Sequence, residues 1–250
     1  MEALFSRFQR LLSETNTDFL RYLHDKIIWT DRMIAIVGAR GVGKTTMMLQ
    51  RIKLHHNISD TLYVTADDMY FADHKLLDLA EQFVKMGGKY LFIDEIHRYV
   101  NWSKELKLIY DYLPHLQVVF TGSSMLDIYR GTDDLSRRVQ LYTLHGMSFR
   151  EYLNLRYHLQ LQPLSLDDVL HHNVAFDGVD YPLAAFKDYL NNGYYPFSRE
   201  VGLYHERLRQ IVQLILDVDI PQFANMNAAT SRKLKQLLAI IAKSVPFKPN

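Results

Sequence analysis

A glycine-rich segment that ends in a lysine and a threonine is the first feature of the sequence that can do chemistry. Residues 38–45 fit the pattern GxxxxGK[ST] and directly follow the apolar run Met33–Val37. The backbone amides of such a loop form a concave anion site, assisted by the N-terminus of the next helix. The lysine can reach the β and γ oxygens of a nucleotide, and the threonine hydroxyl can ligate Mg²⁺. The candidate nucleotide-binding residues are Gly38, Ala39, Arg40, Gly41, Val42, Gly43, Lys44, Thr45 and Thr46.

An acidic pair at the end of an apolar strand is the second chemical feature. Asp94 and Glu95 follow Leu91-Phe-Ile. We expect Asp94, together with Thr45, to hold Mg²⁺, and Glu95 to orient and deprotonate an attacking water, with Lys44 as a second catalytic group. The alternative is a solvated cap between strand and helix, because acidic residues are favoured at helix starts.

Hydroxyl groups follow the next apolar strand, at Thr121, Ser123 and Ser124. One of them, with Ser123 as the candidate nucleotide contact, can sense the γ-phosphate at the carboxyl end of the sheet. An N-cap of the following helix is an equally good interpretation of the two serines. The sequence contains no NKxD, the pattern of a guanine-selecting loop, so ATP is favoured over GTP.

Three arginines come shortly after this strand, at Arg130, Arg137 and Arg138. An arginine near the γ-phosphate stabilises the charge that develops in the transition state, whether it comes from the same chain or from a neighbouring subunit. Surface ion pairing is the alternative for each of them. We take Arg138, ahead of Arg137, as the candidate catalytic arginine.

Strands and helices alternate around these motifs. The pattern predicts strands at 33–37, 61–65, 90–93, 117–120 and 139–144, with helices to about 56, at 76–86, at 104–113 and at 124–129. This alternation indicates βαβ units and a parallel sheet covered on both faces. The separation of Lys44 from Asp94 leaves room for a helix, a strand and a helix, and predicts an extra strand between the phosphate-loop strand and the Asp94 strand.

The two ends of the chain have a helical pattern. Helical spacing predicts one amphipathic helix from Leu4, Phe5, Phe8, Leu11 and Leu12, and a second from Phe19, Leu20 and Leu23. After Ser148, which forms a capping box with Glu151, helical periodicity dominates, with helices expected at 148–159, 183–190, 203–217 and 231–243. We expect an ATPase domain over residues 1–160, with residues 1–30 as a helical lead-in, and a mainly helical region over 161–250.

Composition excludes several classes of protein. The 250 residues are 48% apolar and 23% charged, and 29 basic residues against 28 acidic ones leave a formal charge of +1. Such a balance gives no general attraction to nucleic acid. The absence of cysteine excludes disulfides, thiolate zinc sites and a thiol nucleophile, and fits a reducing cytosol. No apolar run approaches the length of about 18 residues that a membrane helix needs, and the first residues lack a signal-peptide core. We therefore expect a cytoplasmic protein without membrane contact.

The stretch from Ile34 to Leu153 resembles the bacterial and archaeal AAA-type ATPases that carry a C-terminal domain of unknown function. The family has a loop similar to GPRQVGKTT, and the corresponding residues here are GARGVGKTT. Three further family features follow here in the same order: LFIDEIH, a tryptophan at Trp102 and TGSS. The family arginine in LAGRVEVIELPPLSFREFL corresponds to Arg138 in LSRRVQLYTLHGMSFREYL. The resemblance implies a P-loop NTPase fold of the AAA-like type with a smaller helical C-terminal region. The family chains normally run well beyond 250 residues, so we expect residues 161–250 to be the start of a longer second domain, in a truncated chain or in a short member of the family.

Two further patterns are set aside. His171-His172 beside two aspartates lacks the spacing of a metal site and is better explained as a polar loop. The tail from Pro221 carries five basic residues and no acid, which makes nucleic-acid contact conceivable, but a helix with one solvated face explains it more simply.

These observations favour a Mg²⁺-dependent ATPase in which hydrolysis of bound ATP moves the helical C-terminal region. A homo-oligomer is implied if the arginine acts on a neighbouring subunit, and no protein partner is indicated. The alternative is a signalling switch that binds ATP or ADP with negligible turnover. A small-molecule kinase is disfavoured by the acidic pair at Asp94-Glu95 and by the lack of an arginine-rich lid.

Overall fold

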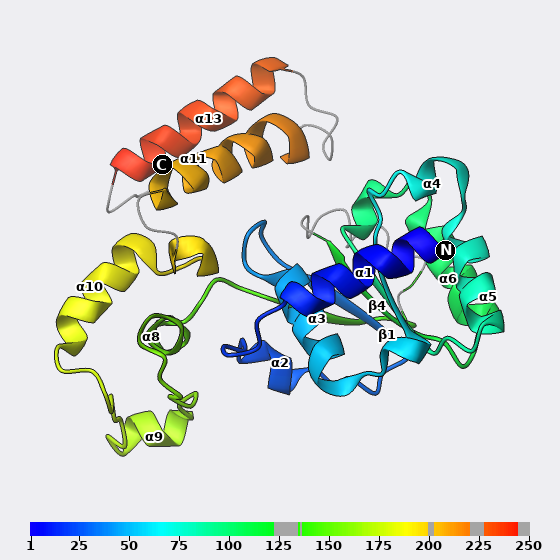
Figure 1. Ribbon diagram of the computed structural model, residues 1–250. Coiled ribbons are helices and arrows are strands. Elements are labelled where there is room, and N and C mark those ends of the chain that lie inside the picture. Colours follow the sequence, from blue (N-terminus) through cyan, green and yellow to red (C-terminus); the bar gives the residue numbers. More distant parts are fainter. Residues whose placement is uncertain (123–134, 136, 200–202, 221–227, 245–250) are drawn as a thin grey trace. The chain divides into compact units, whose positions relative to one another are not determined.

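Five strands form one parallel sheet at the centre of the fold (Figure 1). The structure is a computed structural model, which describes residues 1–122, 135, 137–199, 203–220 and 228–244. In the sheet the strands follow the order β2-β3-β4-β1-β5. The alternating pattern of the sequence and the parallel α/β fold are thereby confirmed. The strands are β1 (Met33–Val37), β2 (Thr61–Thr65), β3 (Tyr90–Asp94), β4 (Gln117–Gly122) and β5 (Gln140–Thr143).

An extra strand does lie between the phosphate-loop strand and the Asp94 strand, but the segment between the two motifs does not supply it. β4 lies between β1 and β3, with Val118 paired to Met33 on one side and to Leu91 on the other. This strand comes after both motifs in the sequence, whereas β2, which the intervening segment supplies, lies at the edge of the sheet. Because all strands are parallel, the residues that follow β1, β3 and β4 meet at one edge, here called the carboxyl edge.

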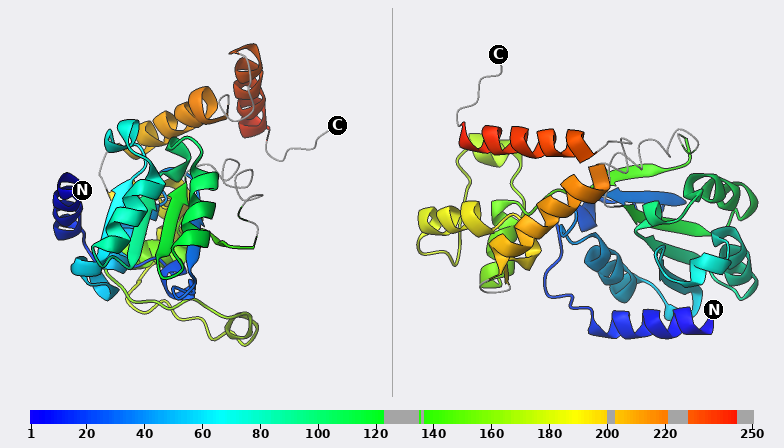
Figure 2. Two further views of the ribbon diagram at one scale, coloured as in Figure 1. Left: turned by 90° about the vertical axis from the view of Figure 1, so that its right-hand side faces the viewer. Right: turned by 90° about the horizontal axis from the view of Figure 1, so that it is seen from above.

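Helices cover both faces of the sheet. Right-handed crossovers place α3 on one face and the connections from β2 to β3 and from β3 to β4 on the other. Accordingly α1 packs beside α3, and α5 packs against α6 (Figures 1 and 2). The helix expected at 124–129 lies outside the described residues. The elements are α1 (Glu2–Glu14), α2 (Leu23–Lys26), α3 (Lys44–His55), η1 (Ile58–Asp60), α4 (Tyr70–Asp73), α5 (Leu76–Lys85), η2 (Ile96–Arg98) and α6 (Trp102–Tyr112).

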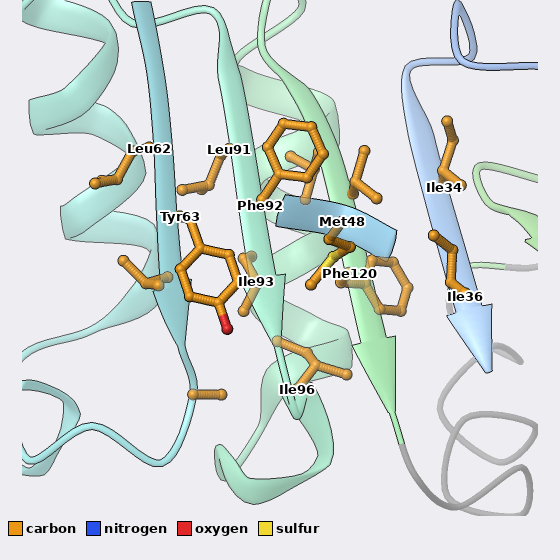
Figure 3. Packing of buried hydrophobic residues seen from close by; sticks show 14 of the residues in the cluster. Ile34, Ile36, Met48, Leu62, Tyr63, Leu91, Phe92, Ile93, Ile96 and Phe120 are labelled. Carbon is orange, nitrogen blue, oxygen red and sulfur yellow. The ribbon is translucent and has the colours of Figure 1, made fainter. Parts of the chain in front are cut away.

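The main hydrophobic core lies between the sheet and these helices. All five residues of β1 are buried, as a strand covered on both faces requires. Figure 3 shows Met48 of α3 in front of the strands, close to the rings of Phe92 and Phe120. The helix α1 adds Phe8, whose ring lies 6.4 Å from that of Tyr63 on β2. This rigid core holds the strand ends, and therefore the motifs that follow them, in fixed positions.

The second helix expected in the N-terminal lead-in is reduced to a single turn. α1 is confirmed, but residues 15–22 are irregular, and α2 is a single turn that begins only at Leu23. Side chains explain the difference. Asn16 accepts a hydrogen bond from the amide of Asp18 at 2.7 Å, and Gln50 donates to the carbonyls of Asn16 and Phe19 at 2.8 and 2.9 Å. These bonds use backbone groups that a helix would pair internally.

A second, smaller hydrophobic cluster lies after the sheet. It contains Met147, Tyr152, Leu153, Leu155 and Ala185. The expected capping box is present, since Ser148 and Glu151 bond reciprocally at the start of the first helix. The elements of this part are α8 (Phe149–Tyr157), α9 (Leu166–Leu170), α10 (Pro182–Asn192) and η3 (Pro196–Arg199).

The chain divides by compactness into the units Met1–Arg199 and Glu200–Asn250. The second unit contains α11 (Tyr204–Leu214), the π-helical turn η4 (Ile215–Asp219) and α13 (Ala228–Lys243), with Lys235 and Asp217 in an ion pair at 2.5 Å. The domain boundary expected near residue 160 stays a prediction, because compactness describes packing and not the limits of a family domain. Within the described ranges, no helix is both long and apolar enough to cross a membrane.

Candidate functional site

The loop between β1 and α3 has the backbone of a phosphate cradle. Gly41 and Gly43 have φ values of 85° and 97°, in the left-handed region that favours glycine. A Cβ at Gly38 would lie 2.2 Å from the carbonyl oxygen of Leu144, so only glycine fits there. The loop is therefore held tightly on its buried side, while Ala39, Gly41, Thr45 and Thr46 are exposed on its open side.

Lys44 is buried inside this loop. Its side chain is 5% exposed, and Nζ donates to the carbonyl oxygens of Gly38 at 2.9 Å and Ala39 at 3.2 Å. Burial lowers the pKa of the ammonium group, and the nearby carboxylates of Glu95 and Asp94 offset part of that decrease. A partly desolvated cation at the start of a helix is a strong attractor for an anion.

Asp94 is the centre of a buried hydrogen-bond network. Its Oδ2 accepts from the hydroxyl of Thr45 at 2.5 Å and from that of Tyr63 at 3.0 Å. Its Oδ1 accepts from the hydroxyl of Thr121 and from the amide of Glu95, the latter at 3.2 Å. Three strands and the helix α3 are thus tied together at one carboxylate. The two residues expected to bind the metal, Thr45 and Asp94, are in direct contact.

Glu95 lies beside this network in an unusual backbone conformation. Its φ is 51°, a left-handed value that is uncommon for a residue other than glycine. The amide of Glu95 donates to Thr121 Oγ1 at 3.1 Å, and its carboxylate Oε2 lies 3.3 Å from Nε2 of His97. The side chain is 23% exposed, but Oε2 itself is buried. Positive φ at functional sites is a recognised form of stored backbone strain.

Tyr63 belongs to this site although the motifs did not indicate it. It lies on β2 and pairs in register with Phe92 of β3. Asp94 is two residues beyond Phe92, so the side chains of Tyr63 and Asp94 lie on the same face of the sheet. Figure 3 shows its hydroxyl directed toward the carboxyl end of the strands. Burial, and secondarily the charge of Asp94, raises the pKa of Tyr63, which keeps the phenol protonated as a donor. A polar tyrosine in an apolar strand is the signal that could have identified it.

A cavity of about 210 Å³ adjoins the start of α3. It lies next to the phosphate loop, because Gly43 and Thr46 form part of its wall. Its surface combines apolar side chains with a few polar groups, as small-molecule sites generally do. A larger open hollow of about 760 Å³ between residues 66–75 and 98–105 contains no residue of the phosphate loop. The remaining residues of the smaller cavity are Asn16, Phe19, Arg21, Gln50, Leu155 and Pro196.

The two candidate arginines that the structure describes, Arg137 and Arg138, are not at this site. Arg138 precedes β5, whose Gln140 pairs with Ile34 at the start of β1, so it lies at the opposite, amino edge of the sheet. There its Nε and Nη2 bond to the carboxylate of Asp111 at 3.0 and 3.3 Å. Arg137 is exposed. Arg130 and the hydroxyls of Ser123 and Ser124 lie outside the described residues.

Metal ligation at this site would rest on few protein groups. Mg²⁺ commonly uses one or two carboxylates together with phosphate oxygens and waters, and the hydroxyl of Thr45 beside the carboxylate of Asp94 fits that chemistry. In the part of the chain that the structure describes, no three histidine, aspartate or glutamate side chains are grouped to hold a metal. The roles expected of the individual residues stay predictions.

The parallel sheet with β4 inserted between β1 and β3, the glycine loop before α3 and the acidic end of β3 define the P-loop ATPase class with an added acidic residue. Residues 30–153 match the model of a protein family described as an AAA domain. Residues 30–153 therefore carry an AAA domain with the P-loop NTPase fold.

Individual proteins are similar to this chain over most of its length. The uncharacterized protein MJ1637 of Methanocaldococcus jannaschii is 28% identical over 263 aligned residues, which cover 96% of this chain and 54% of that protein. The chain thus spans about half the length of this relative. PCH-2 of C. elegans is similar at 16% identity and a TM-score of 0.44, over 85% of this chain and 60% of that one. Hsp104 in a closed state with ATPγS and casein is similar at 18% identity and a TM-score of 0.47, over 78% and 39%.

Proposed function

We propose that this chain binds ATP with Mg²⁺ at the carboxyl edge of its sheet and hydrolyses it. The observation that carries the proposal is the direct contact between the two motifs: Thr45 of the phosphate loop donates to Asp94 of the acidic pair at 2.5 Å. The loop would hold the phosphates through its amides and Lys44. Thr45 and Asp94 would hold Mg²⁺, which would supply positive charge to neutralise the charge that develops on the phosphate oxygens.

The chain's own groups have defined tasks in this proposal. Asp94 keeps its carboxylate oriented through its four donors and supports the metal together with Thr45. Glu95 accepts a proton from water as the water oxygen attacks the γ-phosphorus, and ADP leaves with the bond to that phosphorus broken. Thr121 fixes the backbone of Glu95 through the bond to its amide. The hydroxyls of Ser123 and Ser124 remain candidates for sensing the γ-phosphate.

The smaller cavity beside the loop would receive the nucleobase. It is adjacent to Gly43 and Thr46, and Phe19 and Pro196 provide apolar surface for a flat ring. The carbonyl and amide groups of Asn16 and Gln50 lie in the same wall and can hydrogen-bond a base edge. Together with the missing NKxD pattern, this supports ATP as the nucleotide.

Motion of residues 161–250 coupled to hydrolysis is the second part of the proposal. The segment after β5 passes directly against the phosphate loop, as the contact between Gly38 and Leu144 shows. Pro196 of η3 lies 3.7 Å from the position of a Cβ at Gly43. Residues beyond the sheet therefore meet the loop, and a change in the loop has a short route to them.

A nucleotide switch with negligible turnover is the second candidate. Two observations favour it: the carboxylate of Glu95 is beside His97, and Arg138 is at the far edge of the sheet. A single chain in this arrangement would bind nucleotide while its own Arg138 lies too far away to act on the γ-phosphate. Assembly with a second copy would supply an arginine there and convert the switch to an ATPase.

Binding of fluorescent ATP with Mg²⁺ and with excess EDTA tests the site. We expect Mg²⁺ to raise the affinity of the wild type and to have little effect on Thr45→Ala, which removes the hydroxyl but leaves the other donors to Asp94. Thr15→Ala, at the end of α1, is the matched control and should behave as wild type. Binding that is indifferent to Mg²⁺ in the wild type, or no binding, would contradict the proposal.

A further inference from the structure

Arg21 is a buried arginine in the irregular segment between α1 and α2. Its side chain is 6% exposed, and its guanidinium donates to one carboxylate and three backbone carbonyl oxygens. Nε donates to Oε1 of Glu151 at 2.8 Å. Nη1 donates to the carbonyl oxygen of Val42 at 2.7 Å, and Nη2 donates to those of His145 at 2.8 Å and Gly146 at 3.1 Å. One side chain thus joins the lead-in, the phosphate loop and the segment that enters α8.

The bond to Val42 fixes one peptide of the phosphate loop. In a trans peptide the carbonyl and the next amide point to opposite sides. Because the carbonyl of Val42 points to the buried Arg21, the amide of Gly43 faces away from it, as an amide that meets a phosphate must. On one side this peptide is joined to the α-carbon of Gly43, whose φ is 97°, and a glycine rotates at low cost. The bond from Arg21 is therefore a constraint on this peptide that Gly43 itself does not supply.

The other end of the guanidinium is bound to a capped helix. The carboxylate of Glu151 accepts hydrogen bonds from Nε of Arg21, from the amide of Tyr22 at 2.9 Å and from the amide of Ser148 at 2.8 Å. These bonds hold the pKa of Glu151 below its usual value despite its burial. A carboxylate with this number of partners is rigid, so the position of Arg21 depends on the start of α8.

We propose that Arg21 is a positioning residue that orients the Val42–Gly43 peptide for phosphate binding and makes this orientation depend on α8 through Glu151. The inference deepens the proposed function and rests on it: the ligand that benefits is a di- or triphosphate at the loop. Release of α8 from Arg21 would free the peptide to rotate and would weaken the phosphate site. Nucleotide binding, conversely, would favour the docked position of α8.

The test compares two ligands in the variants Arg21→Lys and Arg150→Lys. Fluorescent ADP and inorganic pyrophosphate, the latter by competition, separate the loop from the base cavity that Arg21 also lines. Lysine keeps the charge, but its donors share one nitrogen and cannot reach the acceptors that Nε, Nη1 and Nη2 of Arg21 reach. We therefore expect both affinities to fall about 10- to 100-fold, the loss typical of a charge-assisted hydrogen bond. Arg150 is also on α8, but its bond goes to the carbonyl of Ala175 and not to the loop, so Arg150→Lys should match wild type.

Thermal unfolding of each variant separates positioning from general loss of fold. If Arg21→Lys does not fold, Glu151→Gln takes its place; it keeps an acceptor, and we expect a smaller loss for both ligands. Unchanged affinities in a folded variant, or a loss for ADP without a loss for pyrophosphate, would overturn the role of Arg21. Wild-type protein that binds neither ligand would instead contradict the proposed function, so the two failures are distinguishable.

Discussion

The carboxyl and amino edges of the sheet both carry charged groups, but they are built differently. At the carboxyl edge, Lys44 and Asp94 are buried and bonded to groups from several elements. At the amino edge, Arg138 and Asp111 form a pair whose side chains are 29% and 37% exposed. Tyr110 lies beneath Arg138, with its ring centroid 5.7 Å from the guanidinium carbon.

This difference indicates which groups the chain fixes for its own use. A buried, fully bonded network is expensive to rearrange and keeps its groups in place. A half-exposed ion pair contributes little to stability and is easily exchanged for another partner. The carboxyl edge is therefore a preformed site, whereas Arg138 is available to a partner of opposite charge. Both interpretations can be broken by substitutions at each edge.

The largest effect is expected for Lys44→Ala at the carboxyl edge. The variant removes the cation inside the loop, so we expect ATP affinity to fall by at least about 100-fold, because phosphate loses a charge-assisted partner in a desolvated site. Titration of fluorescent ATP measures the change. Lys53→Ala, on the exposed surface of the same helix, is the control and should bind as wild type. Unchanged affinity in Lys44→Ala would refute the site assignment.

At the amino edge, Arg138→Ala should leave binding intact and reduce turnover. If Arg138 acts on a neighbouring subunit, we expect turnover to fall about 1,000-fold or more, the effect typical of such an arginine, while the free energy of unfolding changes by less than about 1 kcal/mol. Arg137→Ala is the matched control. Mixing Arg138→Ala with Glu95→Gln should restore activity that neither variant has alone. Loss of nucleotide binding in Arg138→Ala would contradict a role of Arg138 in a neighbouring subunit.

A smaller effect is expected for Tyr63→Phe, which removes one donor to Asp94. We expect a loss of about 1 kcal/mol in the free energy of unfolding, typical of a buried hydrogen bond, and a higher Mg²⁺ concentration for half-maximal turnover. Urea unfolding and a Mg²⁺ titration measure the two quantities. Tyr112→Phe, at a residue that is 65% exposed, should change neither. An unaltered Mg²⁺ response in Tyr63→Phe would remove the tyrosine from the site.

Acid pH is expected to change stability alone, through a histidine at the amino half of the sheet. His56 packs on Tyr90 and Phe92, with ring centroids 4.4 and 5.3 Å away, and burial, with a contribution from Arg51, lowers its pKa to about 4. The unfolded chain takes up the proton first, near pH 6.5, so this residue makes stability fall as the pH drops from about 6.5 to about 4. Allowing for its partial exposure, we expect about 1–2 kcal/mol.

Urea unfolding at several pH values tests this expectation. His56→Phe should flatten the dependence in that window, and the remaining slope then comes from other groups, including His55, whose pKa burial also lowers. An identical slope in wild type and His56→Phe would show that the histidine does not titrate as its surroundings imply.

The sequence predicts the carboxyl edge well because its groups follow strands in local motifs. The phosphate loop and the Asp94-Glu95 pair each occupy adjacent positions next to an apolar run, and parallel strands bring such positions together. To predict that Tyr63 belongs to the site, the order of the strands and the face on which each side chain lies must be known. Arg21 required tertiary structure, since it lies in a segment whose spacing predicts a helix while Asn16 and Gln50 stabilise a loop. The location of Arg138 likewise follows from topology, because residues before a strand lie at the edge opposite those after it.

Phosphate release from ATP with Mg²⁺, measured for wild type and Glu95→Gln over a range of protein concentrations, tests the central claim most directly. We expect wild-type turnover to rise faster than linearly with protein concentration, because assembly brings Arg138 to a neighbouring site. We expect Glu95→Gln to lose this turnover while it still binds ATP. Equal turnover in both proteins would contradict the role of Glu95, and nucleotide binding without turnover at any concentration would establish the switch instead of the ATPase.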